Sequence, residues 1–356
     1  MASKTRDSRR RFLIVRHRSY RRFFFVILLR WVKANFPQIV PWFEVCDLPV
    51  QIRDWSRYAL HAAWLQDPVQ GWSTNAYQQA LNLAEQCDLH DVPVVNRVDR
   101  LINATKSRGA ELMSQAGVRV PRMALVRQPE EFQETLSGLR LPVFIREDWG
   151  HDRNLQRVET REDLQQIAWS SFKRPLAVEL VDVRSPADGL YRKYRYVVAG
   201  ELGISHHLHI SRDWITRGED RLLNAHTRRE ELKYISHDDP NHITLQRARK
   251  ALGLDLAAFD YGYTSGGEMI VWEANPFPHF LFSTKSLMYK NPAMHRTMMA
   301  ILHMYFSIAG LPVPAEVNEG LALDFAEVNR RFQIVRKTNL MDRLLALPKS
   351  FPNWPA

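Results

Sequence analysis

The feature that most constrains this chain is the segment 253–280, GLDLAAFDYGYTSGGEMIVWEANPFPHF. Two runs rich in aromatic and β-branched residues, Leu256–Thr264 and Glu268–Ala274, are typical of strands. Between them, Gly266-Gly267 can supply the positive φ angles that a two-residue hairpin turn requires. We therefore predict an antiparallel hairpin whose register follows from that turn.

The register decides which polar side chains meet. It places Ser265 opposite Glu268 and, counted back along both strands, Asp260 opposite Glu273. Asn275 lies two residues beyond Glu273, so the pleat puts it on the same face. Carboxylate and amide oxygens suit Mg²⁺, which commonly takes one or two carboxylates and completes its shell with water and phosphate oxygens. A solvated hairpin face is the alternative, but unpaired carboxylates are costly in so apolar a run, and the pattern favours a metal site.

The 356-residue chain is long enough for two or three domains with substantial cores. Its two cysteines, Cys46 and Cys87, form neither a metal-ligand spacing nor a disulfide framework. This cysteine usage is consistent with a reducing, cytoplasmic compartment.

The net charge of +10 is concentrated at the N-terminus. Residues 1–40 carry eleven Lys/Arg and one acid, whereas residues 41–356 carry 38 charges of each sign. The basic composition therefore predicts no specific nucleic-acid groove in the body of the protein. The arm could be a solubilising tail, a weak contact to anionic lipid or nucleic acid, or one side of a substrate cleft. Within it, Phe23–Val32 is too short and too charged to span a bilayer, and a buried helix is favoured over an interfacial one.

The alternation of strand and helix patterns over residues 1–96 predicts a small parallel-sheet domain. Its first strand is followed by no glycine-rich loop, so a dinucleotide fold has little support. Further on, a helix is expected to begin at Lys106 and to end at Gly117. Residues 211–241 are expected to be irregular, and Leu321–Leu347 to form one or two amphipathic helices. Other expected elements are helices at Glu130–Ser137, Arg161–Trp169, Thr244–Leu252 and Asn291–Ala309, and a linker at Leu311–Glu319.

Four pieces of sequence, in a fixed order, resemble those of a known superfamily. They are Asn96…Lys106…Gly117-Val118…Val120-Pro121, then Leu141-Pro142-Val143-Phe144-Ile145-Arg146, then Ala177–Val181 followed by Tyr194–Gly200, and last Gly253…Asp260…Glu273-Ala274-Asn275-Pro276. In this order the chain resembles the ATP-grasp superfamily over about residues 92–310. Within it, the chain is most similar to the glutathione-synthetase and ribosomal-S6-modification-like carboxylate–amine ligases. The last piece is the most specific.

The resemblance implies an α/β architecture of α+β lobes, namely an ATP-grasp fold with a small N-terminal parallel-sheet domain and a C-terminal helical extension. The implied domains are 1–96, an N-terminal α/β domain with the basic arm; 97–175, a lobe with a lid loop; 176–312, a lobe with metal and nucleotide residues; and 313–356, the helical extension.

The resemblance also implies where ATP binds. The nucleotide would lie between the two lobes, with Lys106 and Arg146 on its phosphates. Glu179 and the backbone of Leu180 and Val181 would hold adenine and ribose.

The remaining residues of the family pattern imply the chemistry. Asp260, Glu273 and Asn275 would hold Mg²⁺ or Mn²⁺ on the phosphates. A carboxylate of a small molecule or peptide would be phosphorylated, and an amine or other nucleophile would then displace phosphate. Arg195 and Lys106 are the implied catalytic residues, with the Arg195 guanidinium steadying the acyl phosphate.

Two departures from the family pattern keep other functions open. Arg146 stands where the family has a second lysine, and the lid segment 147–152 offers one glycine and three acids. An acidic lid over a triphosphate is unfavourable unless a cation or a basic substrate intervenes. A kinase-like phosphotransferase and a catalytically silent nucleotide-binding module are therefore alternatives to the ligase. The sequence does not determine the oligomeric state.

A histidine-rich strand stands outside these motifs. His207 and His209 share one face of the expected strand Ile204–Ile210. A plain surface position is favoured for them over a substrate-facing strand, and a metal site has the least support.

Overall fold

The computed structural model describes residues 11–17, 23–126, 138–150, 154–214, 216 and 220–335. The expected helix Glu130–Ser137, most of the basic arm before residue 23 and the C-terminal part of Leu321–Leu347 lie outside these residues. Among the helices in the described part of the chain, none has the length and apolar character that crossing a bilayer requires.

The described residues form three four-stranded sheets, and the first is the predicted parallel sheet. Its strand order is β2-β1-β3-β4, with strands β1 (Arg11–Arg16), β2 (Phe43–Asp47), β3 (Tyr58–Ala63) and β4 (Val94–Val95). Alternate side chains of β1 face opposite cores: Phe12 packs with helix α1 (Phe23–Asn35), and Leu13 packs with helix α2 (Thr74–Leu89). A parallel sheet covered on both faces explains the short, continuous apolar strands of this region.

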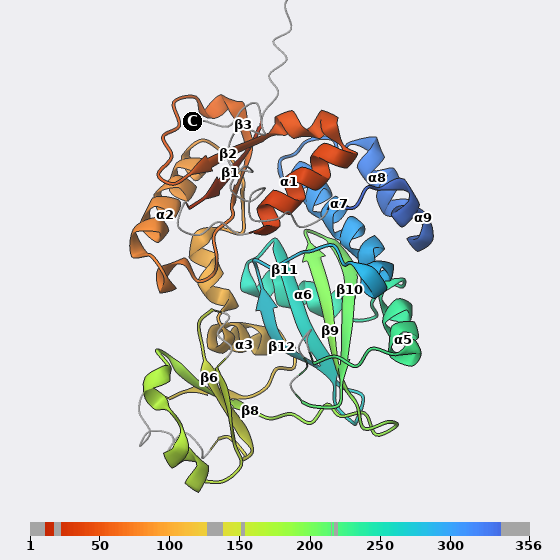
Figure 1. The fold of residues 1–356 in the computed structure, drawn as a ribbon. Helices are drawn as coiled ribbons and strands as arrows, with labels where there is room; N and C mark the ends of the chain where they lie inside the picture. Colours follow the sequence, from red (N-terminus) through yellow and green to blue (C-terminus); the bar gives the residue numbers. More distant parts are fainter. Residues whose placement is uncertain are drawn as a thin grey trace, which may run out of the picture.

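The second sheet is antiparallel and has a small core of its own. Its order is β5-β8-β6-β7, with strands β5 (Met123–Leu125), β6 (Val143–Glu147), β7 (Leu155–Val158) and β8 (Pro175–Glu179). The expected helix Arg161–Trp169 is wrong. Two short 3₁₀ turns, Glu162–Gln166 and Trp169–Ser171, replace it, because the backbone turns to an extended conformation at Ile167. This sheet lies at the opposite end of the molecule from β1–β3 (Figure 1).

The third sheet contains the predicted hairpin. Its order is β10-β9-β11-β12, with strands β9 (Tyr191–Ala199), β10 (Leu202–Ser211), β11 (Leu256–Tyr263) and β12 (Met269–Asn275). Helices α3 (Lys106–Gln115) and α6 (His242–Leu252) pack against one face. Helix α7 (Asn291–Ile308) covers only part of the other face, around Val197 and Ala258, and this leaves the rest of that face available for a site.

The two ends of the described chain share one hydrophobic core. Trp31 of α1 is fully buried and donates its Nε1–H to His295 Nδ1 of α7 at 2.8 Å. Figure 1 shows α1 and α7 close together, with the last described helices beside α7. These last helices are α8 (Ala315–Ala322) and α9 (Phe325–Arg331), so part of the expected linker Leu311–Glu319 is helical instead. The division of the chain into four domains remains a proposal.

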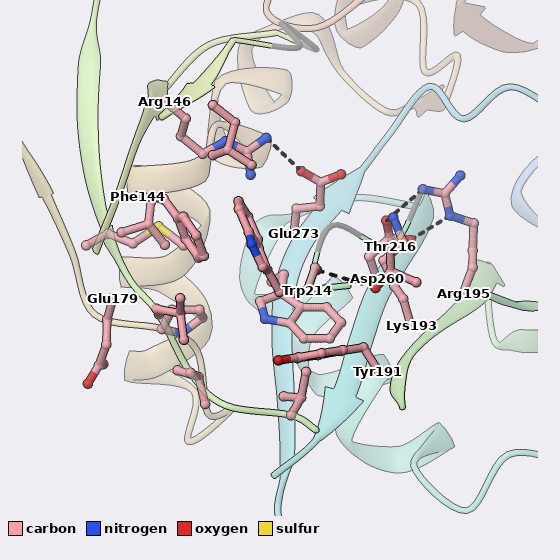
Figure 2. A pocket seen from close by; sticks show the side chains of 18 residues that line it. Phe144, Arg146, Glu179, Tyr191, Lys193, Arg195, Trp214, Thr216, Asp260 and Glu273 are labelled. Atoms are coloured by element: carbon pink, nitrogen blue, oxygen red, sulfur yellow. Dashed lines mark hydrogen bonds and ion pairs between the residues drawn. The ribbon is translucent and has the colours of Figure 1, made fainter. Parts of the chain in front are cut away.

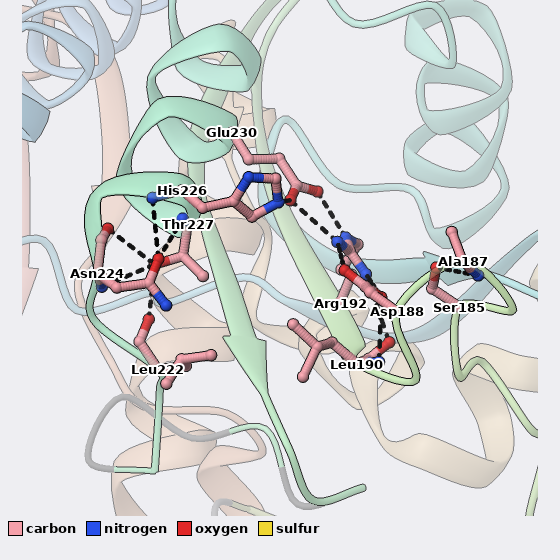
Figure 3. A network of polar contacts seen from close by, with 10 residues as sticks. All are labelled: Ser185, Ala187, Asp188, Leu190, Arg192, Leu222, Asn224, His226, Thr227 and Glu230. Carbon is pink, nitrogen blue, oxygen red and sulfur yellow. Dashed lines mark hydrogen bonds and ion pairs between the residues drawn. The ribbon is translucent and has the colours of Figure 1, made fainter.

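The expectation that residues 211–241 are irregular is wrong, because helix α5 (Ala225–Ile235) lies within them. Asn224 Oδ1 accepts hydrogen bonds from the backbone N–H groups of His226 and Thr227, both at 2.9 Å, and Thr227 Oγ1 accepts from Asn224 N. Glu230 of α5 pairs with Arg192 of β9 at 2.5 Å (Figure 3). Polar contacts hold most of this helix, so hydrophobic periodicity could not reveal it.

Asn96 joins the first sheet to the third. It is buried and has a φ of 48°, a left-handed conformation that asparagine tolerates better than most residues. Its Oδ1 accepts from Asp255 N at 2.7 Å and from Leu256 N at 3.0 Å. Its Nδ2 donates to the carbonyl oxygens of Leu256 and Pro276. One side chain therefore holds the start of β11 and the end of β12 against the end of β4.

Replacing Asn96 should destabilise the fold strongly. We expect Asn96→Ala to lower the free energy of unfolding by about 3 kcal/mol, because several buried backbone groups lose their partner. The control is Asn103→Ala, since Asn103 Nδ2 makes one bond to the backbone, to Leu252 O. That variant should lose about 1 kcal/mol. Urea denaturation measures both losses, and equal values would contradict the bridging role of Asn96.

Candidate active site

The hairpin forms, but its turn differs from the prediction. Thr264 N donates to Glu268 O at 3.0 Å, so Thr264, rather than Ser265, lies opposite Glu268. Gly267 has a φ of 80° and supplies the left-handed residue of a three-residue loop. The predicted two-residue turn is therefore wrong by one residue.

A β-bulge farther along the hairpin compensates for this shift. Tyr261 pairs with Val271, whereas Asp260 pairs with Glu273, so Trp272 is an extra residue on β12. The bulge moves the register by one, and the predicted pairing of Asp260 with Glu273 is confirmed. Gly262 permits the bulge, because a Cβ there would lie 2.4 Å from the Trp272 ring.

A cavity of about 490 Å³ lies between the second and third sheets. One wall is largely apolar and comes from β6, β8 and the segment after β8. The other wall is largely polar and comes from β9, β11 and β12 (Figure 2). Most of the predicted site residues line the cavity: Arg146, Glu179, Leu180, Val181, Arg195, Asp260 and Glu273. The predicted residues Lys106 and Asn275 are buried and are not among its lining residues.

Asp260 is buried in a bidentate ion pair with Arg195. Arg195 Nε donates to Asp260 Oδ1 at 2.6 Å, and a terminal nitrogen of Arg195 donates to Oδ2 at 2.8 Å. Lys193 Nζ lies 3.4 Å from Oδ2. Burial opposes ionisation, but the positive charges of Arg195 and Lys193 outweigh it and hold the pKa of Asp260 well below its usual range. Asp260 is therefore an ionised, buried carboxylate at neutral pH.

Glu273 is half-buried and lies opposite a cation of the second sheet. A terminal nitrogen of Arg146 is 3.8 Å from Glu273 Oε2, so this pair connects β6 to β12 across the cavity (Figure 2). The third predicted metal ligand, Asn275, is buried, and its Oδ1 accepts a hydrogen bond from Phe277 N at 2.9 Å. Among the described residues there is no group of three or more His, Cys, Asp and Glu that could hold a metal. Two carboxylates and one amide are thus the oxygen donors that the hairpin offers.

Lys106 begins α3, as predicted, and its ammonium is buried. Nζ donates to the carbonyl oxygens of Gly150 at 2.8 Å and Asp148 at 3.2 Å. Burial and, next, the positive charge of Arg146 lower the pKa of Lys106 to about 8, although Glu273 opposes the shift. Lys106 and Arg146 therefore place two cations beside the Glu273 carboxylate.

Two acids of the expected lid, Glu147 and Asp148, accept hydrogen bonds from backbone N–H groups. The two carboxylate oxygens of Glu147 accept from Lys173 N at 2.7 Å and Arg174 N at 2.8 Å. Asp148 accepts from Ser107 N at 2.8 Å and from its hydroxyl at 2.9 Å, and so caps the start of α3. The carboxylate oxygens of these two acids are therefore already hydrogen-bonded within the protein in this structure. The third acid of this segment lies outside the described residues.

The residues expected to hold adenine, Glu179 and Leu180, have local partners as well. The Glu179 carboxylate accepts hydrogen bonds from the Arg122 guanidinium at 2.8 and 3.1 Å. Leu180 N donates to Pro142 O at 3.2 Å. In this structure Glu179 connects the end of β8 to Arg122 through an ion pair.

Sequence reasoning missed several residues of the cavity. Lys193 shares the β9 face of Arg195, and strict alternation along that strand could have found it. Phe144 and Trp214 stack with ring centroids 4.4 Å apart and 19° between their planes. Trp214 comes from the loop after β10, and no local pattern predicts that contact.

The architecture is similar to that of solved ATP-grasp ligases. D-alanine–D-alanine ligase from Bacillus anthracis aligns with a TM-score of 0.54 at 11% identity, over 84% of this chain and 97% of that chain. The RimK domain ATP-grasp protein from Sphaerobacter thermophilus gives 0.51 at 15% identity, over 83% and 99%. VanG D-Ala:D-Ser ligase from Enterococcus faecalis gives 0.50 at 14% identity, over 90% and 98%. No protein-family model matches the sequence, and no curated protein matches it significantly. The chain has the ATP-grasp fold.

The Arg195–Asp260 contact should show a large coupling energy. Removing one member of a buried ion pair leaves the other charge uncompensated, whereas removing both costs much less. We expect Arg195→Ala and Asp260→Ala each to lower the free energy of unfolding by about 3 kcal/mol. The double variant should lose well below the sum of these values. Urea denaturation of the three variants measures the coupling.

The same contact should weaken in acid. Because the pKa of Asp260 is depressed in the folded protein, its stabilisation is present above the unfolded value of about 3.9 and is lost as the pH falls below it. The Arg195–Asp260 pair would not be the source of the stability if the two single variants lost additive free energies of unfolding at neutral pH. A coupling energy that grows as the pH falls would show the same.

Proposed function

We propose that the protein is an ATP- and Mg²⁺-dependent ligase that activates a carboxylate as an acyl phosphate and joins it to an amine or other nucleophile. The observation that carries the proposal is the pairing of Asp260 with Glu273 in a cavity between two sheets. Lys106, Arg146 and Arg195 add the cations that a polyphosphate and an acyl phosphate require. The ATP-grasp fold supports this reading.

The cavity suits a nucleotide in size and in polarity. Its volume lies in the range of small-molecule sites. Phe144, Val178 and Leu180 offer an apolar wall for a base, and Arg146 marks the end of the cavity at which Lys106 is buried. We assign the phosphates to these two cations, because guanidinium and ammonium groups are the usual phosphate partners.

Asp260 and Glu273, with Asn275 beside them, fit a hard divalent cation such as Mg²⁺. When bound, the ion would neutralise charge on the phosphates. Arg195 and Arg146 lie on the two carboxylates in this structure, so their guanidinium groups must move off the oxygens that would coordinate it. The move releases both arginines to bind phosphate oxygens.

The proposed reaction has two steps, phosphorylation of the carboxylate and displacement of phosphate by the nucleophile. An oxygen of the acceptor carboxylate attacks the γ-phosphorus of ATP, the bond to the β-phosphate oxygen breaks, and ADP leaves. The amine nitrogen then attacks the acyl carbon, loses a proton and expels inorganic phosphate. Arg195 lines the cavity on β9, where its guanidinium can hold the planar oxyanions of the acyl phosphate.

Purified protein with ATP and Mg²⁺ tests the proposal against its alternatives. A panel of carboxylic acids is offered with and without hydroxylamine, which traps acyl phosphates as hydroxamates. ADP and phosphate released only with an acid and a nucleophile support the ligase. A stable phosphorylated product would indicate a phosphotransferase, and nucleotide binding without turnover would indicate a silent module.

Glu273→Gln should abolish turnover and leave the fold intact. The amide keeps the size of the side chain but removes the negative charge that a divalent ion requires, so we expect ADP release to fall by at least about 100-fold. Glu268→Gln is the matched control, since Glu268 is exposed, pairs with Arg119 and lies outside the cavity. Equal turnover by both variants would refute the metal assignment, and thermal unfolding reports whether each is folded.

Nucleotide affinity should depend on pH through Lys106. Its pKa of about 8 means that the free protein loses this positive charge as the pH rises through that value. The phosphates of ATP stay ionised over the same range. We expect ATP affinity, measured by calorimetry, to fall roughly tenfold between about pH 7 and 9. The Lys106→Arg variant keeps a positive charge, so its affinity for ATP should not depend on pH over this range. An equal fall in the ATP affinity of this variant would exclude Lys106 as the cause.

A further inference from the structure

We propose that the acceptor is an acid with a second anionic group. This group is bound by basic side chains of β9 and β10, by Arg221 between β10 and α5, and by Lys290 just before α7. The inference rests on the proposed function, because it takes one carboxylate of the acceptor to be activated beside Arg195. It adds a binding subsite on the side of Asp260 that faces away from Arg146.

The strand registers place the subsite next to the cavity. Glu273, Asp260, Arg195 and His207 are paired in succession across β12, β11, β9 and β10. Lys193 pairs with His209 in the row beside it. Because residues two apart on a strand share a face, these side chains lie on the cavity side of the sheet.

A second β-bulge turns the histidines toward this face. Ser205 pairs with Tyr196, whereas His207 pairs with Arg195, so His206 is the extra residue on β10. Ser205 Oγ therefore donates to His237 O on the far face, while His207 and His209 lie with Arg195. Without the bulge, Ser205 and His207 would share a face.

The histidines are not plain surface residues. His207 is 8% exposed, and its ring stacks on that of His209 with centroids 4.3 Å apart. Burial and neighbouring positive charges, Lys290 among them, keep the pKa of both rings well below the usual value. His209 Nδ1 is buried and has no hydrogen-bond partner among the described residues. A neutral ring with an unused buried nitrogen suits a polar ligand group.

Positive charge exceeds negative charge around these rings. Lys193, Arg195, Arg221 and Lys290 all act electrostatically on His209. Two carboxylates pair with these four cations. Asp260 is bound by Arg195 and Lys193, and Glu231 is bound by Lys290 at 3.2 Å. Arg221 is half-buried and makes no ion pair with any described residue. Like charges gathered in a half-buried site repel one another, and an anionic ligand group would relieve that repulsion.

The position of this charge favours the acceptor over the nucleotide. Figure 2 shows Arg146 and Arg195 on opposite sides of the carboxylates Glu273 and Asp260. The phosphates are assigned to the Arg146 side, so the cations beyond Arg195 remain for another ligand. Neighbouring strands lie about 4.8 Å apart, which puts the two anionic groups of the acceptor roughly 5 to 8 Å from each other. A dicarboxylate with a short carbon chain meets that spacing.

Calorimetry on the full chain tests the subsite with defined probes. Succinate, glutarate and adipate are titrated into the protein with ADP and Mg²⁺, and the monoamide of glutaric acid serves as the singly charged match. We expect the best dicarboxylate to bind at least about tenfold more tightly than the monoamide, since each charge-assisted contact is worth about that factor. Equal affinity, or no binding of any dicarboxylate at millimolar concentration, would overturn the proposal.

Two substitutions locate the second anionic group. Arg221→Gln removes a charge that has no ion-pair partner among the described residues, and His209→Phe keeps a ring to stack on His207 while removing its nitrogens. Each should reduce the preference for the dicarboxylate to less than about twofold. Arg212→Gln, an exposed position before Trp214, is the control and should retain the preference. Selectivity that survives both site variants would place the second group elsewhere and refute the assignment.

The binding assay separates this inference from the proposed function. Charge-dependent binding of glutarate without any ATP consumption supports the subsite and counts against the ligase. ATP consumption with acids of a single charge only, and no dicarboxylate preference, supports the ligase and overturns the subsite.

Discussion

The bidentate contact between Arg195 and Asp260 is the interaction on which the polar wall of the cavity depends. It buries a carboxylate that could not remain ionised alone, and it ties β9 to β11 at the point where helix α7 stops covering the sheet. Lys193 adds a second cation to the same carboxylate. The site is therefore charged before any ligand enters, and the proposed divalent ion would have to compete with side chains of the protein.

The cavity exists because the second and third sheets keep separate cores. The core around Val143, Ile145 and Phe172 belongs to the second sheet alone, whereas the first and third sheets share theirs with α1 and α7. Asn96 strengthens the connection between the first and third sheets through its bonds to β11 and to Pro276. The contacts between the two sides of the cavity include the Arg146–Glu273 pair and the stacking of Phe144 on Trp214. Contacts between single side chains suit a cleft that must admit a ligand.

Two β-bulges orient the side chains of the candidate site, and each acts by shifting a register by one residue. On β12 the bulge at Trp272 restores the Asp260–Glu273 pairing that the longer turn would otherwise have lost. On β10 the bulge at His206 moves His207 and His209 to the face of Arg195. A one-residue shift reverses the face of every side chain beyond it, so these irregularities decide the composition of the site.

The sequence by itself determined the parallel N-terminal sheet, the start of α3 at Lys106 and the presence of a hairpin that carries Asp260 and Glu273, because periodicity and glycine positions act over a few neighbouring residues. Four features depended on tertiary structure: helix α5, the backbone partners of Glu147 and Asp148, the register of the turn and the burial of His207. Polar contacts between distant segments stabilise α5. The residues that bind Glu147 and Asp148, namely Lys173, Arg174 and Ser107, are far from them in the sequence. Bulges depend on how whole strands pack, as Trp272 does over Gly262. Local pattern therefore placed the carboxylates on neighbouring strands, and only long-range packing decided their register and which cations surround them.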